Sequence, residues 1–269
     1  MTLTEFQSFG ERIRERIGSS TELHGYFKGA VSRLHFTCRK FGLFGDHKLG
    51  RVLEVGPFYG YLPFLLRDNS TSYAIIEGPE PAVDPLMPLY EQDKVDVHLV
   101  DFFEVFGPTR GASHSLPFPD NSFDLVICWE TMEHFNFNPV KLVRELQRVC
   151  APGAKVHITV PNKASFQALA ALLSRQKLPQ SIKSYFQFED YESDGKTAFY
   201  GFHWREYTPE ELSALFREAG FKVETSHTDV VFHDHESLTA KRRMLRLINK
   251  MIGRLFPRHG TNVFLTAVK

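Results

Sequence analysis

Short runs of consecutive apolar residues alternate along the chain with longer segments whose apolar residues recur every three or four positions. The first pattern is typical of strands buried on both faces, and the second is typical of amphipathic helices. Their alternation predicts a parallel sheet with helices on both faces. The expected strands lie near 51–55, 73–77, 96–101, 123–128 and 155–160. The expected helices lie near 60–67, 81–92, 139–149 and 163–174.

Both ends of the chain add elements to this core. Residues 3–45 predict one or two helices, because four apolar side chains recur there at helical spacing, namely Phe6, Phe9, Ile13 and Ile17. Thr208 followed by Pro209 is typical of a helix start, and Gly220 is typical of a helix end. Two more strands are expected at 221–230 and 261–269. We therefore expect one doubly wound α/β sheet.

Composition and charge limit the class of protein. The 269 residues suffice for one large domain, and their formal net charge of zero gives no electrostatic reason to expect a nucleic-acid partner. Three widely spaced cysteines, Cys38, Cys128 and Cys150, favour reduced thiols. The N-terminus lacks the pattern of a signal peptide, and no apolar run reaches the roughly 18 residues of a membrane span. We expect a cytoplasmic protein.

One segment departs from this neutral balance. Residues 241–258 contain seven basic residues and no acidic one, and they carry an apolar stripe at helical spacing. Basic amphipathic helices of this kind can lie on an anionic membrane surface, so peripheral membrane contact is one interpretation. A helix docked on the sheet, with its charges in solvent, is the alternative.

Residues 51–66 contain the most informative motif. A short apolar run leads into Glu54, Gly56 and Gly60, and a helical pattern follows. Glycines at such a turn let the backbone approach a ligand closely. Glu54 would repel a phosphate and suit a cationic ligand. Glu77 ends the second strand pattern, where a carboxylate can accept both hydroxyls of a ribose. The combination indicates a positively charged nucleoside without phosphates.

These residues resemble the class I S-adenosylmethionine-dependent methyltransferases, whose first motif is Glu/Asp-x-Gly-x-Gly-x-Gly. Phe58 stands here in place of the middle glycine. The resemblance implies a Rossmann-like, seven-stranded sheet with helices on both faces and an antiparallel last strand. It also implies an S-adenosylmethionine site formed by Glu54, Gly56, Phe58, Gly60, Glu77, Asp101, Phe102 and Trp129. Ser113, His114 or Ser115 are alternatives to Asp101 beside the adenine.

Two further blocks resemble the acceptor side of the same family. Residues 120–134 resemble its fourth strand and active-site loop, and residues 201–212 resemble its late His-x-Arg-x-Tyr pattern. A hydroxyl acceptor gains from a general base, and histidine is the usual one. We expect His134 to be that base and His203 to be the second candidate. The residues expected to orient the base or bind the acceptor are Glu130, Glu133, Arg205 and Tyr207.

We expect four parts along the chain: an N-terminal helical cap at 1–50, a cofactor-binding core at 51–162, an aromatic-rich insertion or lid at 163–207, and the rest of the sheet with the basic helix at 208–269. Nine aromatic residues lie between Tyr185 and Tyr207. Such a segment is typical of a substrate lid, since long loops in compact domains usually serve a function. A hydrophobic cluster under the loop is the alternative.

No metal site is expected. His227, His233 and His235 lie near Asp229 and Asp234, but their spacing matches no zinc motif, so a surface histidine cluster is the simpler interpretation.

The predicted function is therefore S-adenosylmethionine-dependent O-methylation of a small-molecule acceptor, such as a sugar, a glycolipid precursor or a secondary metabolite. Two alternatives remain open. One is a protein that binds the cofactor without catalysis, and the other is a nicotinamide-dependent oxidoreductase. The absence of Gly-x-Gly-x-x-Gly disfavours the oxidoreductase. The oligomeric state is left open.

Overall fold

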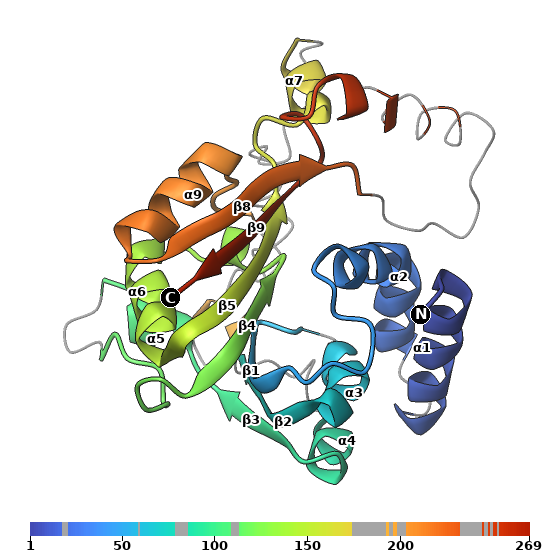
Figure 1. Cartoon of the computed structure of the whole chain (residues 1–269), viewed down its shortest axis with the longest axis vertical. Helices are drawn as coiled ribbons and strands as arrows, with labels where there is room; N and C mark the ends of the chain where they lie inside the picture. Colours follow the sequence, from blue (N-terminus) through green and yellow to red (C-terminus); the bar gives the residue numbers. More distant parts are fainter. Residues whose placement is uncertain are drawn as a thin grey trace.

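A computed structural model describes most of the chain. The described residues are 1–17, 21–58, 60–78, 86–108, 113–173, 192–193, 196–197, 203–231, 244, 247, 250, 251 and 253–269. At its centre lies a seven-stranded sheet in the order β3-β2-β1-β4-β5-β9-β8 (Figure 1). The strands are β1 Gly50–Val55, β2 Ser70–Glu77, β3 Val95–Leu99, β4 Phe123–Trp129, β5 Cys150–Pro161, β8 Lys222–Asp229 and β9 Asn262–Val268.

The pairing of the strands confirms the expected topology. Strands β1 to β5 pair in parallel, whereas β9 runs antiparallel to both of its neighbours, β5 and β8. Strand order reverses between β1 and β4, and the carboxyl ends of such strands form the usual ligand crevice of an open α/β sheet. A separate two-stranded ladder pairs β6 (Glu192–Ser193) with β7 (Lys196–Thr197).

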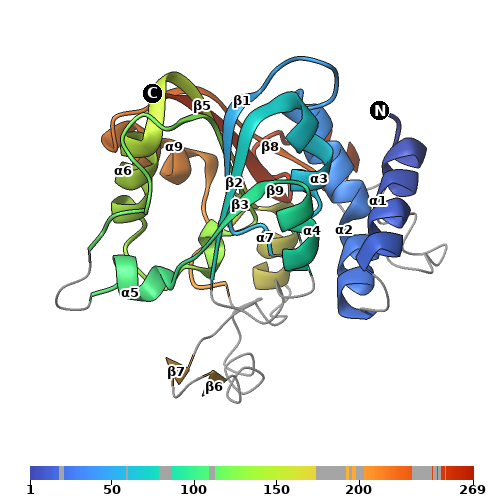
Figure 2. The ribbon, with the colours of Figure 1, turned by 90° about the horizontal axis from the view of Figure 1, so that it is seen from below.

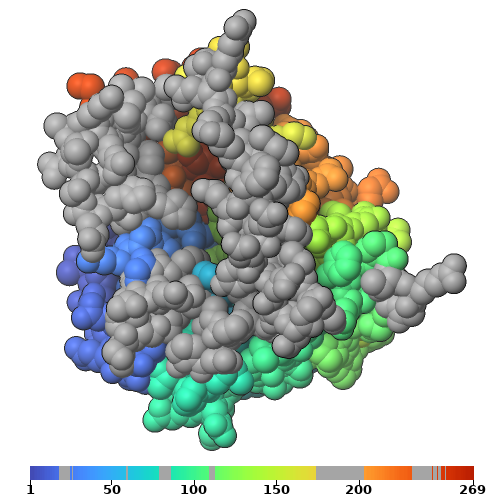
Figure 3. All heavy atoms as spheres, turned by 180° about the vertical axis from the view of Figure 1, so that it is seen from behind, coloured from blue at the N-terminus to red at the C-terminus, as the bar shows by residue number. Residues whose placement is uncertain are grey.

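Helices cover both faces of the sheet (Figure 2). One face carries α1 (Leu3–Ile17), α2 (Thr21–Lys40), α3 (Leu62–Leu66) and α4 (Met87–Gln92). The other carries α5 (Phe102–Phe106), α6 (Pro139–Val149) and α9 (Pro209–Glu218). Seen from behind in Figure 3, the N-terminal helices (blue) and α9 (orange) lie on opposite sides of the molecule. Two 3-10 turns, η1 (Arg67–Asn69) and η3 (Met132–His134), and the helix α7 (Phe166–Leu173) complete the named elements.

Most elements begin and end close to their predicted positions. Helix α6 spans the predicted 139–149, and Thr208 caps α9 through a capping box with Glu211. One element was missed for a physical reason, and one predicted helix is described only in part. Helix α5 was not expected, because five residues are too few to show a helical period. The predicted helix at 81–92 is described only from 86 onward, with α4 beginning at Met87, so its first part lies outside the described residues.

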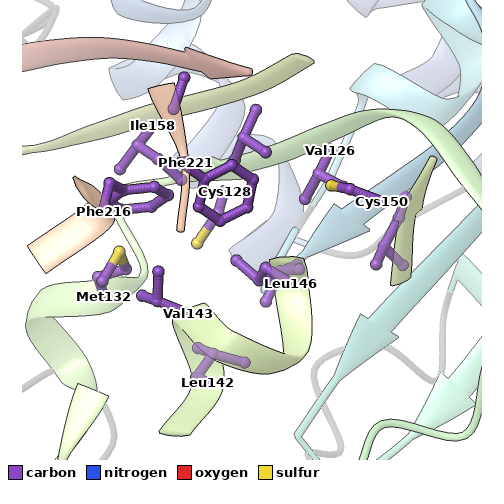
Figure 4. Packing of buried hydrophobic residues seen from close by; sticks show 14 of the residues in the cluster. Val126, Cys128, Met132, Leu142, Val143, Leu146, Cys150, Ile158, Phe216 and Phe221 are labelled. Carbon is purple, nitrogen blue, oxygen red and sulfur yellow. The ribbon is translucent and has the colours of Figure 1, made fainter. Parts of the chain in front are cut away.

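Apolar packing against the sheet gives each face its own core. On the α6 and α9 side, Figure 4 shows side chains from both helices interleaved with those of β4 and β5. The residues labelled there are Val126, Cys128, Met132, Leu142, Val143, Leu146, Cys150, Ile158, Phe216 and Phe221. All three cysteines are free and buried, as expected for reduced thiols. Among the described helices, none combines the length and apolar character that crossing a bilayer requires.

The core predicts a sharp contrast between two leucines. Leu146 of α6 is fully buried, so Leu146→Ala is expected to lower the free energy of unfolding by about 2–5 kcal/mol through lost burial and a cavity. Leu99, at the end of β3, is half exposed, and Leu99→Ala is expected to change it by no more than about 0.5 kcal/mol. Urea unfolding of both variants measures the difference. Equal losses would contradict the placement of α6.

Candidate active site

The turn after β1 is shaped by close packing on the β4 loop. Gly56 has a φ of +65°, and a Cβ added there would lie 2.1 Å from the methyl carbon of Thr131. The Thr131 hydroxyl donates to the Gly56 carbonyl at 3.1 Å, and the Gly56 amide donates to the Ile76 carbonyl at 2.9 Å. A side chain at position 56 is therefore excluded by conformation and by space. The turn and the β4 loop are held together as one unit.

Phe58 adopts a left-handed backbone conformation, which glycine adopts more readily than other residues. Its φ is 52°, which is rare for a residue with a bulky side chain. Its amide donates to the Glu77 carboxylate at 2.5 Å. The side chain is 36% exposed, so it extends toward the surface. At the position where the resembled motif has a glycine, this chain thus has a phenylalanine in a left-handed backbone conformation.

Two buried carboxylates flank the turn. Glu54 accepts a hydrogen bond from the Tyr73 hydroxyl at 2.7 Å, and burial raises its pKa to about 8. Glu77 also accepts from the Gly78 amide at 2.8 Å, and burial raises its pKa to about 7. Each carboxylate would be more stable if a cation or hydrogen-bond donors replaced the lost water. These two side chains fit a cationic nucleoside.

Three further residues expected to contact the cofactor are Asp101, Phe102 and Trp129, and they lie in three different environments. Asp101 caps α5, because its carboxylate accepts from the amides of Phe103 and Glu104 at 2.9 and 3.0 Å. Phe102 packs in the core on the α5 side, 5.0 Å from the ring of Phe135. Trp129 packs on the opposite side of the sheet, and its indole N–H is buried without a hydrogen-bond partner.

The alternative adenine-side residues differ in their freedom to bind. The ring of His114 lies between the Val105 carbonyl, 2.9 Å from Nδ1, and the Lys141 ammonium, 3.0 Å from Nε2. Ser113 is exposed, and its hydroxyl accepts from the Ser115 amide at 3.4 Å. Of these three residues, His114 is therefore the most firmly held by protein groups.

Glu130, directly after β4, is held by residues that are distant in sequence. Its backbone has a φ of 51°, and its amide donates to the Thr159 carbonyl at 2.8 Å. The Asn262 amide nitrogen donates to both carboxylate oxygens, at 3.0 and 2.9 Å. A guanidinium nitrogen of Arg33 in α2 lies 3.9 Å from the same carboxylate. Strained backbone that persists under such restraint is typical of functional sites.

The two candidate bases meet at the end of η3. The rings of His134 and His203 lie edge to face with 4.9 Å between their centroids, although 68 residues separate them in the chain. Glu133 is 1% exposed, one of its oxygens lies 3.9 Å from His134 Nε2, and the other is buried without a hydrogen-bond partner. Burial and the nearby charge of Glu130 raise the pKa of Glu133 well above its usual range.

The segment 203–207 brings the remaining predicted residues to this loop. The amides of Trp204 and Arg205 donate to the Glu133 carbonyl at 2.7 and 3.3 Å. His203 Nδ1 lies 3.2 Å from a Glu206 carboxylate oxygen. The Arg205 guanidinium lies over the ring of Tyr207, 5.3 Å from its centroid. Tyr207 is itself fully buried, and burial raises its pKa to about 12.

The described residues include one grouping with possible metal ligands. Ligand atoms of Glu133, His134 and His203 lie within 4.8 Å of one another. Carboxylate and imidazole groups are ligands that zinc accepts, so this grouping is compatible with a metal ion, and the expectation of no metal stays a prediction. In the second histidine group, His227 stacks on Phe264 and Asp229 pairs with Lys40. Residues 233–235 of this group lie outside the described residues.

Sequence reasoning missed the residues that support the site from a distance. Each of four such residues contacts a predicted residue: Arg33, Thr131, Glu206 and Asn262. Thr131 and Glu206 lie inside the blocks at 120–134 and 201–212 but were not singled out there, whereas Arg33 and Asn262 lie outside every motif. Arg33 could have been singled out as a charged residue on the apolar side of α2, since it is buried. The others carry no comparable signal, because short polar residues are ordinary at the ends of strands and helices.

Comparison with known proteins agrees with this geometry. A "Probable S-adenosylmethionine-dependent methyltransferase" of Mycolicibacterium smegmatis is 28% identical over 183 residues, which is 68% of this chain and 55% of that protein. The chain therefore spans only about half the length of that relative.

Two solved structures share the fold. A chain from the complex between the Haloferax volcanii Trm112 methyltransferase activator and its candidate methyltransferase has a TM-score of 0.59 at 18% identity, covering 91% of this chain and 93% of that one. The [4+2]-cyclase SpnF has a TM-score of 0.52 at 18% identity, covering 89% of this chain and 82% of that one. These likenesses show the fold alone.

The family itself is shown by a model of the methyltransferase domain, which matches residues 25–226. This match includes the turn after β1, the β4 loop and the segment 203–207. The chain therefore belongs to the methyltransferase domain family, and its resemblance to the class I S-adenosylmethionine-dependent methyltransferases is confirmed.

Proposed function

We propose that this protein transfers a methyl group from S-adenosylmethionine to a hydroxyl of a small molecule, such as a sugar, a glycolipid precursor or a secondary metabolite. The main support is that two buried carboxylates, Glu54 and Glu77, flank the turn after β1. Thr131 of the β4 loop bonds this turn and holds the loop against it. The name of the M. smegmatis relative supports the same cofactor.

The residues at the turn fit this cofactor. When bound, S-adenosylmethionine supplies a methyl group on a positively charged sulfur, which is open to in-line displacement by an acceptor. Glu54 offers a buried negative charge to the cationic end. Glu77 would exchange its hydrogen bond from Phe58 for those of the ribose hydroxyls. The backbone of Phe58 at this turn has a left-handed φ of 52°, which glycine adopts readily.

The β4 loop supplies the groups for a hydroxyl acceptor. His134 takes the proton of the hydroxyl, and the adjacent His203, whose Nδ1 lies near Glu206, is the second base candidate. Glu130 and Glu133 bind further hydroxyls of the acceptor, since a buried oxygen of Glu133 has no hydrogen-bond partner. Arg205 and Tyr207 hold the segment 203–207 against the β4 loop. The chemistry needs orientation and exclusion of water, and no metal is part of the proposal.

The alternative is cofactor binding without methyl transfer. The likeness to SpnF favours keeping this alternative, because SpnF is a cyclase with the same fold. Calorimetry with S-adenosylmethionine, followed by turnover assays on candidate acceptors, separates the two functions. Binding without turnover on any hydroxyl acceptor would favour the alternative. Binding of NADH in place of S-adenosylmethionine would instead indicate an oxidoreductase.

The first prediction concerns the ribose ligand. Glu77→Gln is expected to weaken S-adenosylmethionine binding by about 10-fold or more, because hydrogen bonds to a charged acceptor are worth about 1.5–3 kcal/mol. Calorimetry measures the loss. Glu91→Gln is the matched control, since Glu91 is exposed on α4, and it is expected to bind like the unaltered protein. Equal affinity of Glu77→Gln and the unaltered protein would contradict the assignment of Glu77.

The second prediction concerns pH. A cationic ligand favours the ionised carboxylates, so binding lowers the pKa of Glu54 and Glu77 from about 8 and about 7 in the free protein. Affinity is therefore expected to rise with pH through about 7 to 8 and to level off above that range, where both groups are already ionised. Calorimetry across this range measures the rise. In Glu54→Gln the upper part of the rise is expected to disappear, and a pH-independent affinity in the unaltered protein would count against both carboxylates.

The third prediction concerns the base. His134→Ala is expected to lower turnover by about 10²–10⁴-fold while leaving S-adenosylmethionine binding intact, because a positioned base acts on the chemical step. Turnover on an established acceptor, together with calorimetry, measures both effects. His47→Ala, at an exposed position outside the site, is the control.

Two results would overturn the role of His134. Full turnover of His134→Ala combined with a large loss in His203→Ala would move the role to His203. Loss of turnover by the unaltered protein in EDTA, restored by a divalent cation, would show that Glu133, His134 and His203 hold a metal.

A further inference from the structure

Helix α7 has an unusual environment for an apolar helix. Its sequence, Phe-Gln-Ala-Leu-Ala-Ala-Leu-Leu, contains no charged residue, yet no residue of the helix is buried. Its large side chains are Phe166, Leu169, Leu172 and Leu173, and all four are exposed. Leaving such side chains in water is unfavourable by about 25 cal/mol for each Å² of apolar surface, so they favour a partner.

The basic segment near the C-terminus has the same property. Met244, Leu247, Met251 and Leu255 follow one another at intervals of three and four residues, so they share one face of a helix. Their exposed fractions are 63, 63, 62 and 71%. These four side chains do not pack on the sheet, whereas Leu245, Ile248 and Ile252 lie outside the described residues, so the docked-helix interpretation stays open. Phe256, which follows them, is also exposed.

Hydrogen bonds hold the end of this segment against the start of α7. The Phe166 amide donates to the His259 carbonyl at 3.0 Å, and His259 Nδ1 lies 2.6 Å from the Ala164 carbonyl. The Asn162 side-chain amide donates to the carbonyls of Arg258 and Gly260 at 3.1 and 2.8 Å. Figure 1 shows α7 and the red helical turn together at the upper end of the molecule. The start of α7 and the end of the basic segment are therefore adjacent, and the exposed apolar residues of both elements make up the candidate surface.

Basic residues accompany this surface. Lys250, Arg254 and Arg258 are exposed among the apolar residues, and the described residues from 244 to 258 include no acidic one. Arg258 lies 4.0 Å from Glu210 and is 83% exposed, so that contact leaves its charge available. A buried protein interface core is depleted of charged residues, whereas a membrane-surface helix combines apolar anchors with Lys and Arg. The chemistry fits an anionic lipid headgroup region.

We propose that α7 and the described residues between 244 and 258 form a surface that binds an anionic phospholipid bilayer. The apolar side chains enter the boundary between headgroups and acyl chains, and the basic side chains pair with lipid phosphates. Asn162 directly follows β5, whose last residue pairs with Asn262 of β9. Asn262 in turn donates to Glu130, so the surface lies at the same edge of the sheet as the site. Binding would hold the site close to headgroups.

Flotation with two kinds of vesicle tests this proposal. The unaltered protein is expected to float with vesicles of phosphatidylcholine and phosphatidylglycerol at low salt, and to lose binding in high salt or with phosphatidylcholine alone. The triple variant Leu247→Ser, Met251→Ser, Leu255→Ser and the double variant Lys250→Glu, Arg254→Glu are each expected to lower the partition coefficient by about 10-fold or more. The matched control, Leu3→Ser with Leu99→Ser, removes two exposed apolar residues elsewhere and is expected to float normally.

Three outcomes would overturn the proposal. They are failure of the unaltered protein to float with anionic vesicles, an equal loss in the Leu3 and Leu99 control, and a dimer in light scattering that dissociates in the triple variant while no flotation occurs. The last outcome would assign the surface to a second copy of the chain. Flotation is measured without S-adenosylmethionine, and calorimetry without vesicles, so failure of the lipid surface and failure of the proposed methyltransferase function are distinguishable.

Discussion

The contact between Gly56 and Thr131 joins the two halves of the site. The methyl group of Thr131 occupies the space that a side chain at position 56 would need, and its hydroxyl bonds the Gly56 carbonyl. Because β1 and β4 are adjacent parallel strands, this contact sets the turn that faces the ligand against the loop that carries Glu133 and His134. The distance between a bound methyl group and its acceptor depends on that arrangement.

Much of the fold could be predicted from the sequence because each element follows a local rule. Strand β4 and helix α6 have strong periodicity, and the cap at Thr208 is a local hydrogen-bond motif. Helix α5 was missed because its only strong signal is the capping residue Asp101, which resembled a ligand-binding carboxylate at a strand end. One residue type can serve both purposes, and the chain alone does not distinguish them.

Part of the candidate site could be proposed from motifs. The motifs single out Glu77, His134 and His203, and the structure brings the two histidines together and the Phe58 amide to the Glu77 carboxylate. Arg33 and Asn262 were not predictable, because each reaches Glu130 through tertiary packing of elements about one hundred or more residues away. No local pattern records which side chains the fold brings to a given loop.

Buried carboxylates distinguish this edge of the sheet as a candidate binding site. Glu54, Glu77 and Glu133 are all buried, and burial raises the pKa of each, so the ligand-free protein holds them at a cost in free energy. A purely structural core would replace such groups with apolar residues, often with a gain in stability. Their position at the carboxyl ends of β1, β2 and β4 fits the proposed ligands, which bring a positive charge and hydroxyl groups. Helix α7 follows β5 in the chain, so its exposed apolar residues come after the carboxyl end of a strand that neighbours β4.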